Sequence, residues 1–316
     1  MALPEKVVDN HYFESIIDTS DEWIVQRTGV RERRHVVEGE TTSTLATAAA
    51  RKAMANAGCE ATDLDLIICA TITPDQPFPA VACFVQEALG AENVPSMDIS
   101  AACSGFVYAM ATATAFIESG HYKRVLIIGA ETLSRTTDFT DRGSCILFGD
   151  GAGAAVLEAT EEDKGVRYTV MQADGKGKDF IHIPAGGSRT PLTPELIEAK
   201  EDKMKMDGRG VYKFAVSKMQ WLLGDCMDAC GLTPDDIDMV IPHQVNSRII
   251  ESATSKHNFP IEKVYTNLDR FGNTSAASVP IALAEAMEKG VVREGMTVLF
   301  VAFGAGLTGA GAVVPL

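Results

Sequence analysis

Three residues of this 316-residue chain stand where a reactive side chain could do chemistry, and Cys103 is the first of them. It lies between the apolar segment VPSMDISAA and the segment SGFVYAMATATAFIESG, which Gly120 would close. This order predicts a strand, a tight turn of small residues and a helix. The positive end of a helix dipole lowers the pKa of a thiol, and the thiolate is the nucleophilic form. We therefore expect Cys103 to be a nucleophile with a lowered pKa.

His243 and Asn273 are the other two candidates. His243 ends the apolar segment IDMVIPH, and Asn273 precedes small residues in DRFGNTSAAS. Taken singly, a structural histidine and a helix N-cap are the more ordinary roles for such residues. His35, in the basic run RERRH, is expected on the surface. Cys226 and Cys230 lack a second pair of ligands at metal-binding spacing, so no metal site is predicted.

The elements that would position these residues occur twice, at an offset of 173 residues. The segment AGCEATDLDLII (57–68) resembles CGLTPDDIDMVI (230–241), and VLIIGA (125–130) resembles VLFVAF (298–303). At the same offset AACSGFVYAM falls on TSAASVPIAL, and His243 falls on Ala70. Because all these segments share one register without a gap, they indicate a duplicated unit. The two halves differ at the strand end, where His243 corresponds to Ala70, and this difference indicates a site built on one half only.

Each copy predicts the same succession of elements. A helix (41–58 or 213–231) should start near Thr41, Thr42 or Ser43 in the first copy and end at Gly58 or Gly231. Strands, apolar throughout and therefore buried on both faces, alternate with helices, which favours a mostly parallel sheet. Ligands bind outside the carboxyl ends of such strands. We expect two α/β halves, 1–163 and 164–316, with 173–210 as an excursion that covers a pocket.

Composition limits the class of protein. The chain has 28 Lys and Arg against 43 Asp and Glu, a formal net charge of −15, and 46% hydrophobic residues. These values indicate a folded, soluble enzyme and disfavour nucleic-acid binding.

The uncharged segment 298–316 is broken by glycines, so two strands are expected rather than a membrane helix. Seven scattered cysteines and no signal segment indicate the cytoplasm. GDGAGAAV (149–156) lacks the spacing of a phosphate loop and indicates closely approaching strands.

Three motifs, AACSGF, PHQVN and GNTSAAS, resemble in this order the Cys–His–Asn site of the β-ketoacyl-acyl carrier protein synthase III family. The resemblance continues through DTSDEWIVQRTGVRERR, DRGSCILFGDGAGAAVLEA and MDGRGVYKFAV and covers essentially the whole chain. It implies the thiolase fold, α/β with duplicated halves in a five-layer αβαβα sandwich. It also implies a homodimer that condenses an acyl-CoA primer with malonyl-acyl carrier protein. The coenzyme A thioester is a substrate, and no cofactor and no metal are implied.

The resemblance also assigns roles to individual residues. Cys103 would take the acyl group, while His243, as a neutral donor, and Asn273 would stabilise the enolate formed by decarboxylation. The backbone N–H of Cys103 and one from the 304–306 loop would hold the oxyanion. The implied substrate contacts are Trp23 and Arg142 around adenine, Arg27 on the phosphates, Gly208 and Asn246 along pantetheine, and Phe148, Gly306 and, across the dimer, Phe78 at the acyl group. Lys213, Arg248 and Lys256 match positions that dock the carrier protein.

The chain departs from the family pattern at three places, one of which is extra length in 173–205 that is expected to alter the lid of the substrate tunnel. The family has a strand before the segment that here is Leu3, Pro4 and Glu5, so a sheet strand is expected to be missing. The late loop has Ala305 and Gly309 where a glycine and a tryptophan are common. Two alternatives stay open: a specialised acyl-CoA condensing enzyme of secondary metabolism, and a catalytically silent acyl-CoA binding protein, which the intact Cys103, His243 and Asn273 disfavour. The preferred primer stays open too.

Overall fold

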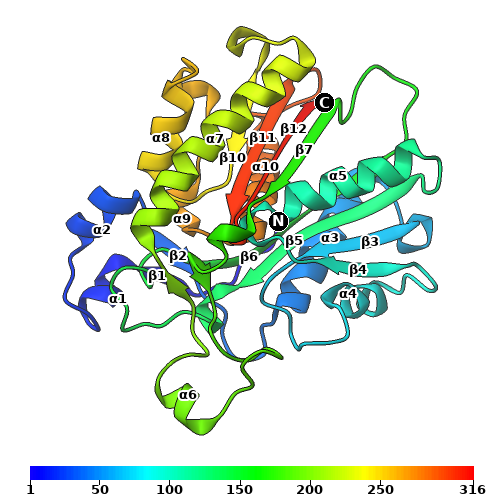
Figure 1. Cartoon of the computed structure of the whole chain (residues 1–316). Coiled ribbons are helices and arrows are strands. Elements are labelled where there is room, and N and C mark those ends of the chain that lie inside the picture. The colour runs from blue at the N-terminus through cyan, green and yellow to red at the C-terminus, as the bar shows by residue number, and fades with distance from the viewer.

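Five layers of secondary structure stack in the computed structural model, which describes residues 1–316 (Figure 1). Two sheets alternate with three layers of helices, and each helix layer buries an apolar face against a sheet. The helix layers are, in order, α3 (Thr42–Ala57) with α4 (Val81–Leu89), α5 (Gly105–Glu118) with α10 (Ser278–Glu288), and α7 (Gly208–Cys230) with α8 (Ser247–Ser255). The predicted αβαβα sandwich is confirmed.

The first sheet has the strand order β4-β3-β5-β6. Its strands are β4 (Ser96–Ile99), β3 (Leu66–Ala70), β5 (Arg124–Thr132) and β6 (Asp150–Glu158). Strand β3 runs parallel to both β4 and β5, and β6 is antiparallel to β5. This sheet is mostly parallel, as the alternation of strands and helices predicted.

The second sheet has the order β10-β11-β12-β7, and here the prediction of a mostly parallel sheet is wrong. Its strands are β10 (Met239–Pro242), β11 (Thr297–Gly304), β12 (Thr308–Pro315) and β7 (Tyr168–Ala173). Only β10 and β11 run parallel. Strand β12 follows β11 after the short turn 305–307, and so short a connection can only join antiparallel strands. This hairpin confirms that 298–316 forms two strands.

The internal repeat is visible in the backbone. Leu66 pairs with Val125 in the first sheet, and Met239 pairs with Val298 in the second, at the offset found in the sequence. Helices α3 and α7 end at Gly58 and Gly231, which share φ 65° and have ψ of 33° and 32°. This left-handed conformation favours glycine, so the two predicted helix stops are confirmed.

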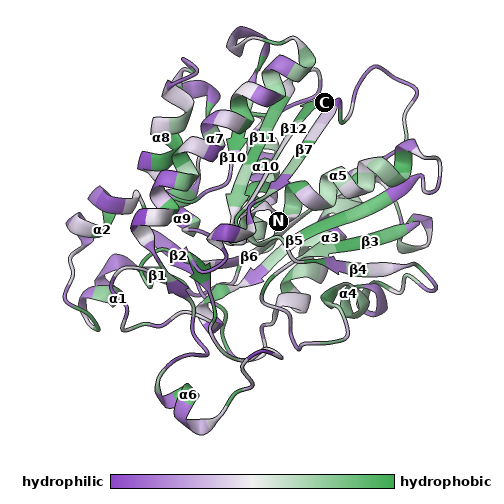
Figure 2. Cartoon of the chain, viewed as in Figure 1, coloured by the Kyte–Doolittle hydropathy of each residue, from purple (hydrophilic) through white to green (hydrophobic).

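Apolar side chains lie along the strands and on the helix faces that cover them, as Figure 2 shows. Ile68 and Ile127 of the first sheet and Phe300 of the second belong to one core between the two sheets, which α5 and α10 fill. Burying side chains of this size contributes about 1.5–3 kcal/mol each. The rigid core places the carboxyl ends of β3, β5, β10 and β11 at one edge of the central layer.

Smaller elements flank the two sheets. Strand β1 (Val7–Asp9) pairs with β2 (Glu32–Arg34), and β8 (Ile181–His182) pairs with β9 (Lys205–Met206). The remaining helices are α1 (Asn10–Glu14), α2 (Asp21–Thr28), α6 (Pro194–Glu198) and α9 (Leu268–Phe271). The predicted excursion after β7 holds β8, α6 and β9. No helix has both the length and the apolar character needed to cross a membrane.

The expectation that His35 lies on the surface is wrong. Its side chain is buried, and Nε2 lies 3.4 Å from the Phe148 carbonyl oxygen. The neighbouring Arg33 is fully buried as well, donating to the carbonyl oxygen of Val8 and to Oδ1 of Asn10. A basic run suggests a surface segment in sequence, but the face that carries Arg33 and His35 is buried, which the run itself could not reveal.

The outer edges of the two sheets differ. In the second sheet β7 covers the edge of β12, whereas in the first sheet the edge of β6 is paired only where Ala2 and Ala152 exchange backbone hydrogen bonds of 2.7 and 2.8 Å. Close packing explains the glycines of the segment GDGAGAAV (149–156). A Cβ at Gly153, for example, would lie 2.6 Å from the Pro280 carbonyl carbon.

Candidate active site

Cys103 lies in a 3-10 turn (Ala102–Ser104) between β4 and α5, as the sequence predicted. Ala102 has φ 46°, a left-handed conformation that turns the chain sharply before the thiol. Gly304, at the end of β11, packs against this turn: a Cβ there would lie 2.6 Å from the Cys103 backbone nitrogen. Only glycine allows the two halves of the molecule to approach so closely.

The prediction that the pKa of Cys103 is lowered is wrong. Burial raises the pKa of this thiol to about 12. Helix α5 begins two residues later, at Gly105, so the thiol is set back from the helix end. The cost of burying a thiolate outweighs the helix dipole, whose influence is confined to the first turn. The resting nucleophile is therefore a protonated thiol, and its proton must leave before or during attack.

His243 directly follows β10 and lies at the carboxyl end of that strand. Its Nδ1 lies 2.7 Å from Oγ of Ser278, the first residue of α10. Phe303 packs against the imidazole at a ring-centroid distance of 5.5 Å. Burial lowers the pKa of His243 to about 3, so the ring is neutral at physiological pH. It can donate a hydrogen bond, and it is a weak base.

Asn273 lies between α9 and the 3-10 turn Ser275–Ala277. Its Oδ1 accepts a hydrogen bond of 2.9 Å from the Ser275 backbone nitrogen, two residues on. The N-cap of this turn is Thr274, so Asn273 supports the turn without being its N-cap. Its own backbone is held by Leu147 and Gly149 at 2.8 and 2.9 Å. The Nδ2 group makes no hydrogen bond within the chain and lies at a cavity. The oxygen of this amide thus serves the fold, and its nitrogen is free for a ligand.

These three side chains, far apart in sequence, line one cavity of about 50 Å³. Its other polar side chain is Ser275, and Gly304 and Ala305 line it from the late loop. The apolar lining residues are Ile72, Ala102, Leu133, Leu147, Phe148, Ile181, Met204, Met206, Val211, Val245 and Phe303. The structure places the predicted Phe148 here but leaves Gly306 outside the lining. The excursion covers the cavity through Ile181, Met204 and Met206.

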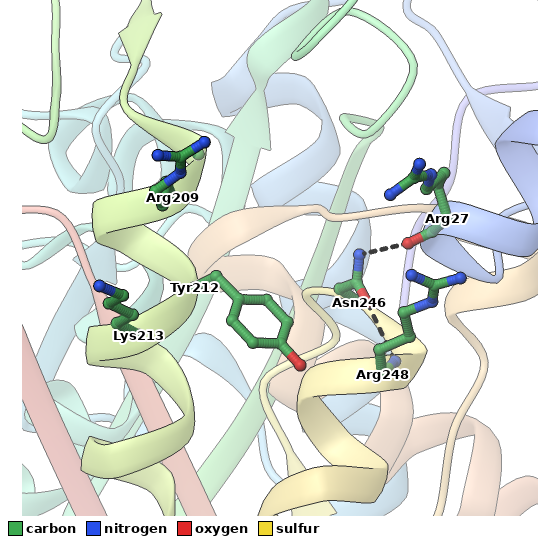
Figure 3. Close-up of a pocket in the computed structure, with 7 residues that line it drawn as sticks. Arg27, Arg209, Tyr212, Lys213, Asn246 and Arg248 are labelled. Atoms are coloured by element: carbon green, nitrogen blue, oxygen red, sulfur yellow. Dashed lines mark hydrogen bonds between the residues drawn. The ribbon is translucent and has the colours of Figure 1, made fainter.

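A second, larger cavity of about 360 Å³ opens beside α2, α7 and α8 (Figure 3). The residues that line it are Arg27, Gly208, Arg209, Tyr212, Lys213, Asn246 and Arg248. In Figure 3 Arg209 and Lys213 face Arg27 and Arg248 across Tyr212 and Asn246. Four cations and no carboxylate surround this space, although the chain as a whole is strongly acidic.

Five of these seven residues were predicted from the sequence, and Arg209 and Tyr212 were missed. Both lie in the first turns of α7, beside the predicted Gly208 and Lys213, and that proximity was the available signal. Asn246 caps α8: its Oδ1 accepts from the Arg248 nitrogen, and its Nδ2 donates to the Arg27 carbonyl oxygen, both at 3.0 Å. Lys256, at the other end of α8, is exposed and lies outside the cavity.

The two cavities adjoin. Val211 lines the small cavity and Tyr212 the large one, and Val245 and Asn246 are divided in the same way. We call the larger cavity, which four cations line, the cationic mouth. Consecutive residues of α7 and of the loop before α8 therefore separate this mouth from the apolar space around the Cys103 thiol. A ligand with a charged end and a long thin arm fits this arrangement, with the end of the arm at Cys103.

Trp23 and Arg142 lie together at the surface. The Arg142 guanidinium is 4.3 Å from the Trp23 ring centroid, and that of Arg27 is 5.7 Å away. A flat ligand could stack between Trp23 and Arg142 only after Arg142 moves off the ring. Phe78 is 82% exposed and does not line the cavity of its own chain. No group of three or more His, Cys, Asp or Glu is arranged to hold a metal ion.

The fold and the site together define a thiolase-type condensing acyltransferase, and comparison with known proteins agrees. Residues 97–175 match the family model of 3-oxoacyl-[acyl-carrier-protein (ACP)] synthase III, and residues 227–316 match the model of its C-terminal part. This chain belongs to the β-ketoacyl-[acyl-carrier-protein] synthase III family. It is an acyltransferase that carries out the initiating condensation of fatty-acid synthesis.

Individual relatives support this assignment. The β-ketoacyl-[acyl-carrier-protein] synthase III of Caldanaerobacter subterraneus subsp. tengcongensis is 51% identical over 312 residues, 99% of this chain and 94% of the relative. The crystal structure of the Aquifex aeolicus VF5 synthase III superposes with a TM-score of 0.92 at 43% identity, covering 100% and 97% of the two chains. A priming β-ketosynthase of the R1128 polyketide pathway has the same TM-score but 33% identity, over 99% and 93%. Fatty-acid initiation is thus favoured over secondary metabolism.

Proposed function

We propose that the chain transfers a short acyl group from acyl-CoA to Cys103 and condenses it with malonyl-acyl carrier protein. The products are CO₂, free coenzyme A and a 3-oxoacyl-acyl carrier protein. The observation that carries this proposal is the position of Cys103, His243 and Asn273 around one small apolar cavity beneath a cationic mouth. We further propose that the reaction takes place in the cytoplasm, where the seven unpaired cysteines would stay reduced, and that it uses no cofactor.

In the first half-reaction the Cys103 sulfur attacks the thioester carbonyl carbon of acyl-CoA. The new C–S bond forms, the bond to the coenzyme A sulfur breaks, and the carbonyl oxygen carries negative charge in between. The backbone N–H of Cys103, beside Gly304, supports a proposed oxyanion site formed with an N–H of the 304–306 loop. Phe148 and its apolar neighbours exclude water from the acyl group.

In the second half-reaction malonyl-carrier protein loses CO₂, and the resulting carbanion attacks the acyl group on Cys103. Negative charge develops on the malonyl thioester oxygen, where His243 Nε2 and Asn273 Nδ2 would donate hydrogen bonds. This requires Nδ1 of His243 to accept from Ser278, so that the neutral ring carries its proton on Nε2. The lowered pKa of His243 supports a donor role and disfavours a role as general base.

The cationic mouth would bind the phosphates that both substrates carry. Arg27, Arg209, Lys213 and Arg248 supply charge, and Asn246 and Gly208 would lie along the pantetheine arm. We assign the coenzyme A adenine to Trp23 and Arg142, whose stacked side chains would part to receive it. Lys256 lies farther along α8, where an acidic carrier protein would extend the contact.

We propose a homodimer in which the exposed Phe78 reaches the acyl cavity of the second copy. Phe78 has the largest exposed fraction among the exposed large apolar side chains, 82%, and aromatic residues are enriched at interfaces. The partner's aromatic ring would then limit the length of the primer. A small cavity at Cys103 favours short primers.

The test is product formation from radiolabelled acetyl-CoA with malonyl-carrier protein, compared with malonyl-CoA at the same concentration. We expect the 3-oxoacyl product to form with both and the carrier protein to be preferred at low salt, because the mouth attracts an acidic partner. Absence of product with acetyl-CoA and with every other short-chain acyl-CoA would contradict the proposed function. Equal use of both malonyl donors would contradict the docking surface alone.

Reversing one charge at the mouth tests carrier docking. We expect Arg248→Glu to raise KM for malonyl-carrier protein about tenfold at low salt, with a smaller effect on malonyl-CoA, and the difference between the two to shrink in high salt. Lys123→Glu is the matched control: it makes the same change in net charge on an exposed lysine at the amino end of β5. If both variants raise KM equally, overall acidity rather than docking explains the result.

A further inference from the structure

Ser275 holds a buried hydroxyl that the fold does not use. The residue is 2% exposed, and its Oγ completes no hydrogen bond within the chain although it lines the cavity that contains Cys103. Its backbone has φ 49°, matching φ 46° at Ala102, the corresponding residue of the first half. Alanine therefore suffices for this turn. A buried polar group without a partner is unfavourable, so a role toward a ligand or the thiol is indicated.

Glu131 is a second buried polar group without a role in the two proposed half-reactions. It lies fully buried near the end of β5 and forms no ion pair. Its Oε2 accepts hydrogen bonds from Thr73 Oγ1 at 2.5 Å and Thr71 Oγ1 at 3.2 Å, whereas Oε1 receives only the Ile72 N–H at 3.3 Å. A buried carboxylate without a cation is costly to keep, and one of its oxygens is still able to accept.

The duplication places these two groups beside each other. Gly304 corresponds to Glu131, and it packs against the turn that carries Cys103. By the same relation the end of β5 packs against the turn that carries Ser275. Gly129, two residues before Glu131 and so on the same face of β5, packs against the backbone of Ala276 in that turn. The Glu131 side chain therefore lies on the face of β5 that meets the turn carrying Ser275, and Ser275 lines one cavity with Cys103.

We propose that Ser275 and Glu131 form the path by which the Cys103 thiol loses its proton during acylation. Ser275 Oγ accepts the proton from Sγ and passes its own proton to the Glu131 carboxylate. The S–H bond breaks as the new S–C bond to the acyl carbon forms. The proton then returns through Ser275 to the departing coenzyme A sulfur, which leaves as a thiol. Ser275 is the group in contact with the nucleophile, and Glu131 acts through it. This inference rests on the proposed function.

The charges around the thiol support this direction of proton transfer. Burial raises the pKa of Cys103 to about 12, so the thiol needs a base. His243 is a poor base, because burial lowers its pKa to about 3. Burial raises the pKa of Glu131 to about 7, which brings it nearer to that of the thiol than any unperturbed carboxylate. Burial is the main cause that raises the pKa of the Cys69 thiol on β3 well above the usual value, and this thiol also feels the charge of Glu131.

The test is single-turnover acylation of the full chain by radiolabelled acetyl-CoA, without a malonyl donor, from about pH 5.5 to about pH 9. For the unmodified chain we expect the rate to rise with pH through about 7, because Glu131 must be ionised to accept the proton. Glu131→Gln and Ser275→Ala should each lower the rate at neutral pH about 10²–10⁴-fold, the usual contribution of a positioned base. Glu131→Gln should also lose the rise near pH 7.

The sign of the effect separates a proton path from a simple charge effect. The negative charge of Glu131 raises the pKa of the Cys103 thiol, so its removal alone would speed acylation. Glu285→Gln is the matched control: Glu285 is also buried, but it pairs with Arg270 away from the cavity. This control should keep the rise near pH 7. Ser275→Ala should fold, since Ala102 adopts the same backbone conformation. If Glu131→Gln is unstable, the acylation rate of Ser275→Ala tests the proton path instead.

Acylation of both variants at the rate and pH dependence of the unmodified chain, or faster acylation of Glu131→Gln, would overturn the proton path. Failure of the unmodified chain to be acylated by any short acyl-CoA would instead contradict the proposed function. Malonyl decarboxylation, measured on the same variants, should change less than acylation, because its donors remain in place.

Discussion

Condensation should fall about 10³-fold or more when Cys103 is replaced by Ser, whereas malonyl decarboxylation should persist. Burial already holds the pKa of the thiol at about 12, and a hydroxyl in the same place is a far weaker acid and nucleophile. Loss of the nucleophile is among the largest effects that a single substitution has on an enzyme. The proposed enolate donors His243 and Asn273 are unaffected, so CO₂ release from malonyl-carrier protein remains possible.

This prediction is checked by measuring product formation and release of radiolabelled CO₂ side by side. A control variant, Cys145→Ser, changes a buried cysteine outside the cavity and should retain condensation. Retention of condensation by Cys103→Ser, or its equal loss in the Cys145 control, would remove Cys103 from the role of nucleophile.

The opposite pattern is expected for Asn273→Ala. Cys103 should still accept an acetyl group, while malonyl decarboxylation should fall about 10²–10³-fold, as when one donor of an oxyanion hole is removed. The Nδ2 group is the part of Asn273 that has no partner within the chain, so its loss would remove only the hydrogen bond proposed to the malonyl oxygen.

Asn273 Oδ1 also supports the turn before α10 by accepting from the Ser275 N–H, so alanine removes two interactions at once. Asn273→Asp is therefore the sharper variant, because the retained Oδ1 can still accept from Ser275 while the Nδ2 donor is lost. Both variants should lose decarboxylation, and the aspartate variant should melt closer to the unmodified chain. An Asn273→Ala protein that decarboxylates normally but cannot be acylated would make Asn273 a partner of the nucleophile.

The sequence alone determined the parts of this protein that depend on local chemistry and on repetition. Helix α3 starts after Thr41 and ends at Gly58 because a hydroxyl caps backbone N–H groups and glycine adopts a left-handed conformation. The repeat at an offset of 173 residues predicted the duplicated fold, since two similar segments bury similar faces. The positions of Cys103, His243 and Asn273 at strand and helix ends could be predicted for the same reason.

Tertiary structure decided what depends on burial and on contacts between distant segments. Sequence placed Cys103 before a helix, but the surroundings contributed by β11 and the 304–306 loop determine that its pKa rises rather than falls. Likewise His35 is buried although it lies in a basic run. Glu131 and Ser275 look ordinary in sequence, and only the packing of β5 against the second half gives them a common neighbour in Cys103. Desolvation is a property of the assembled neighbourhood, which no local pattern encodes.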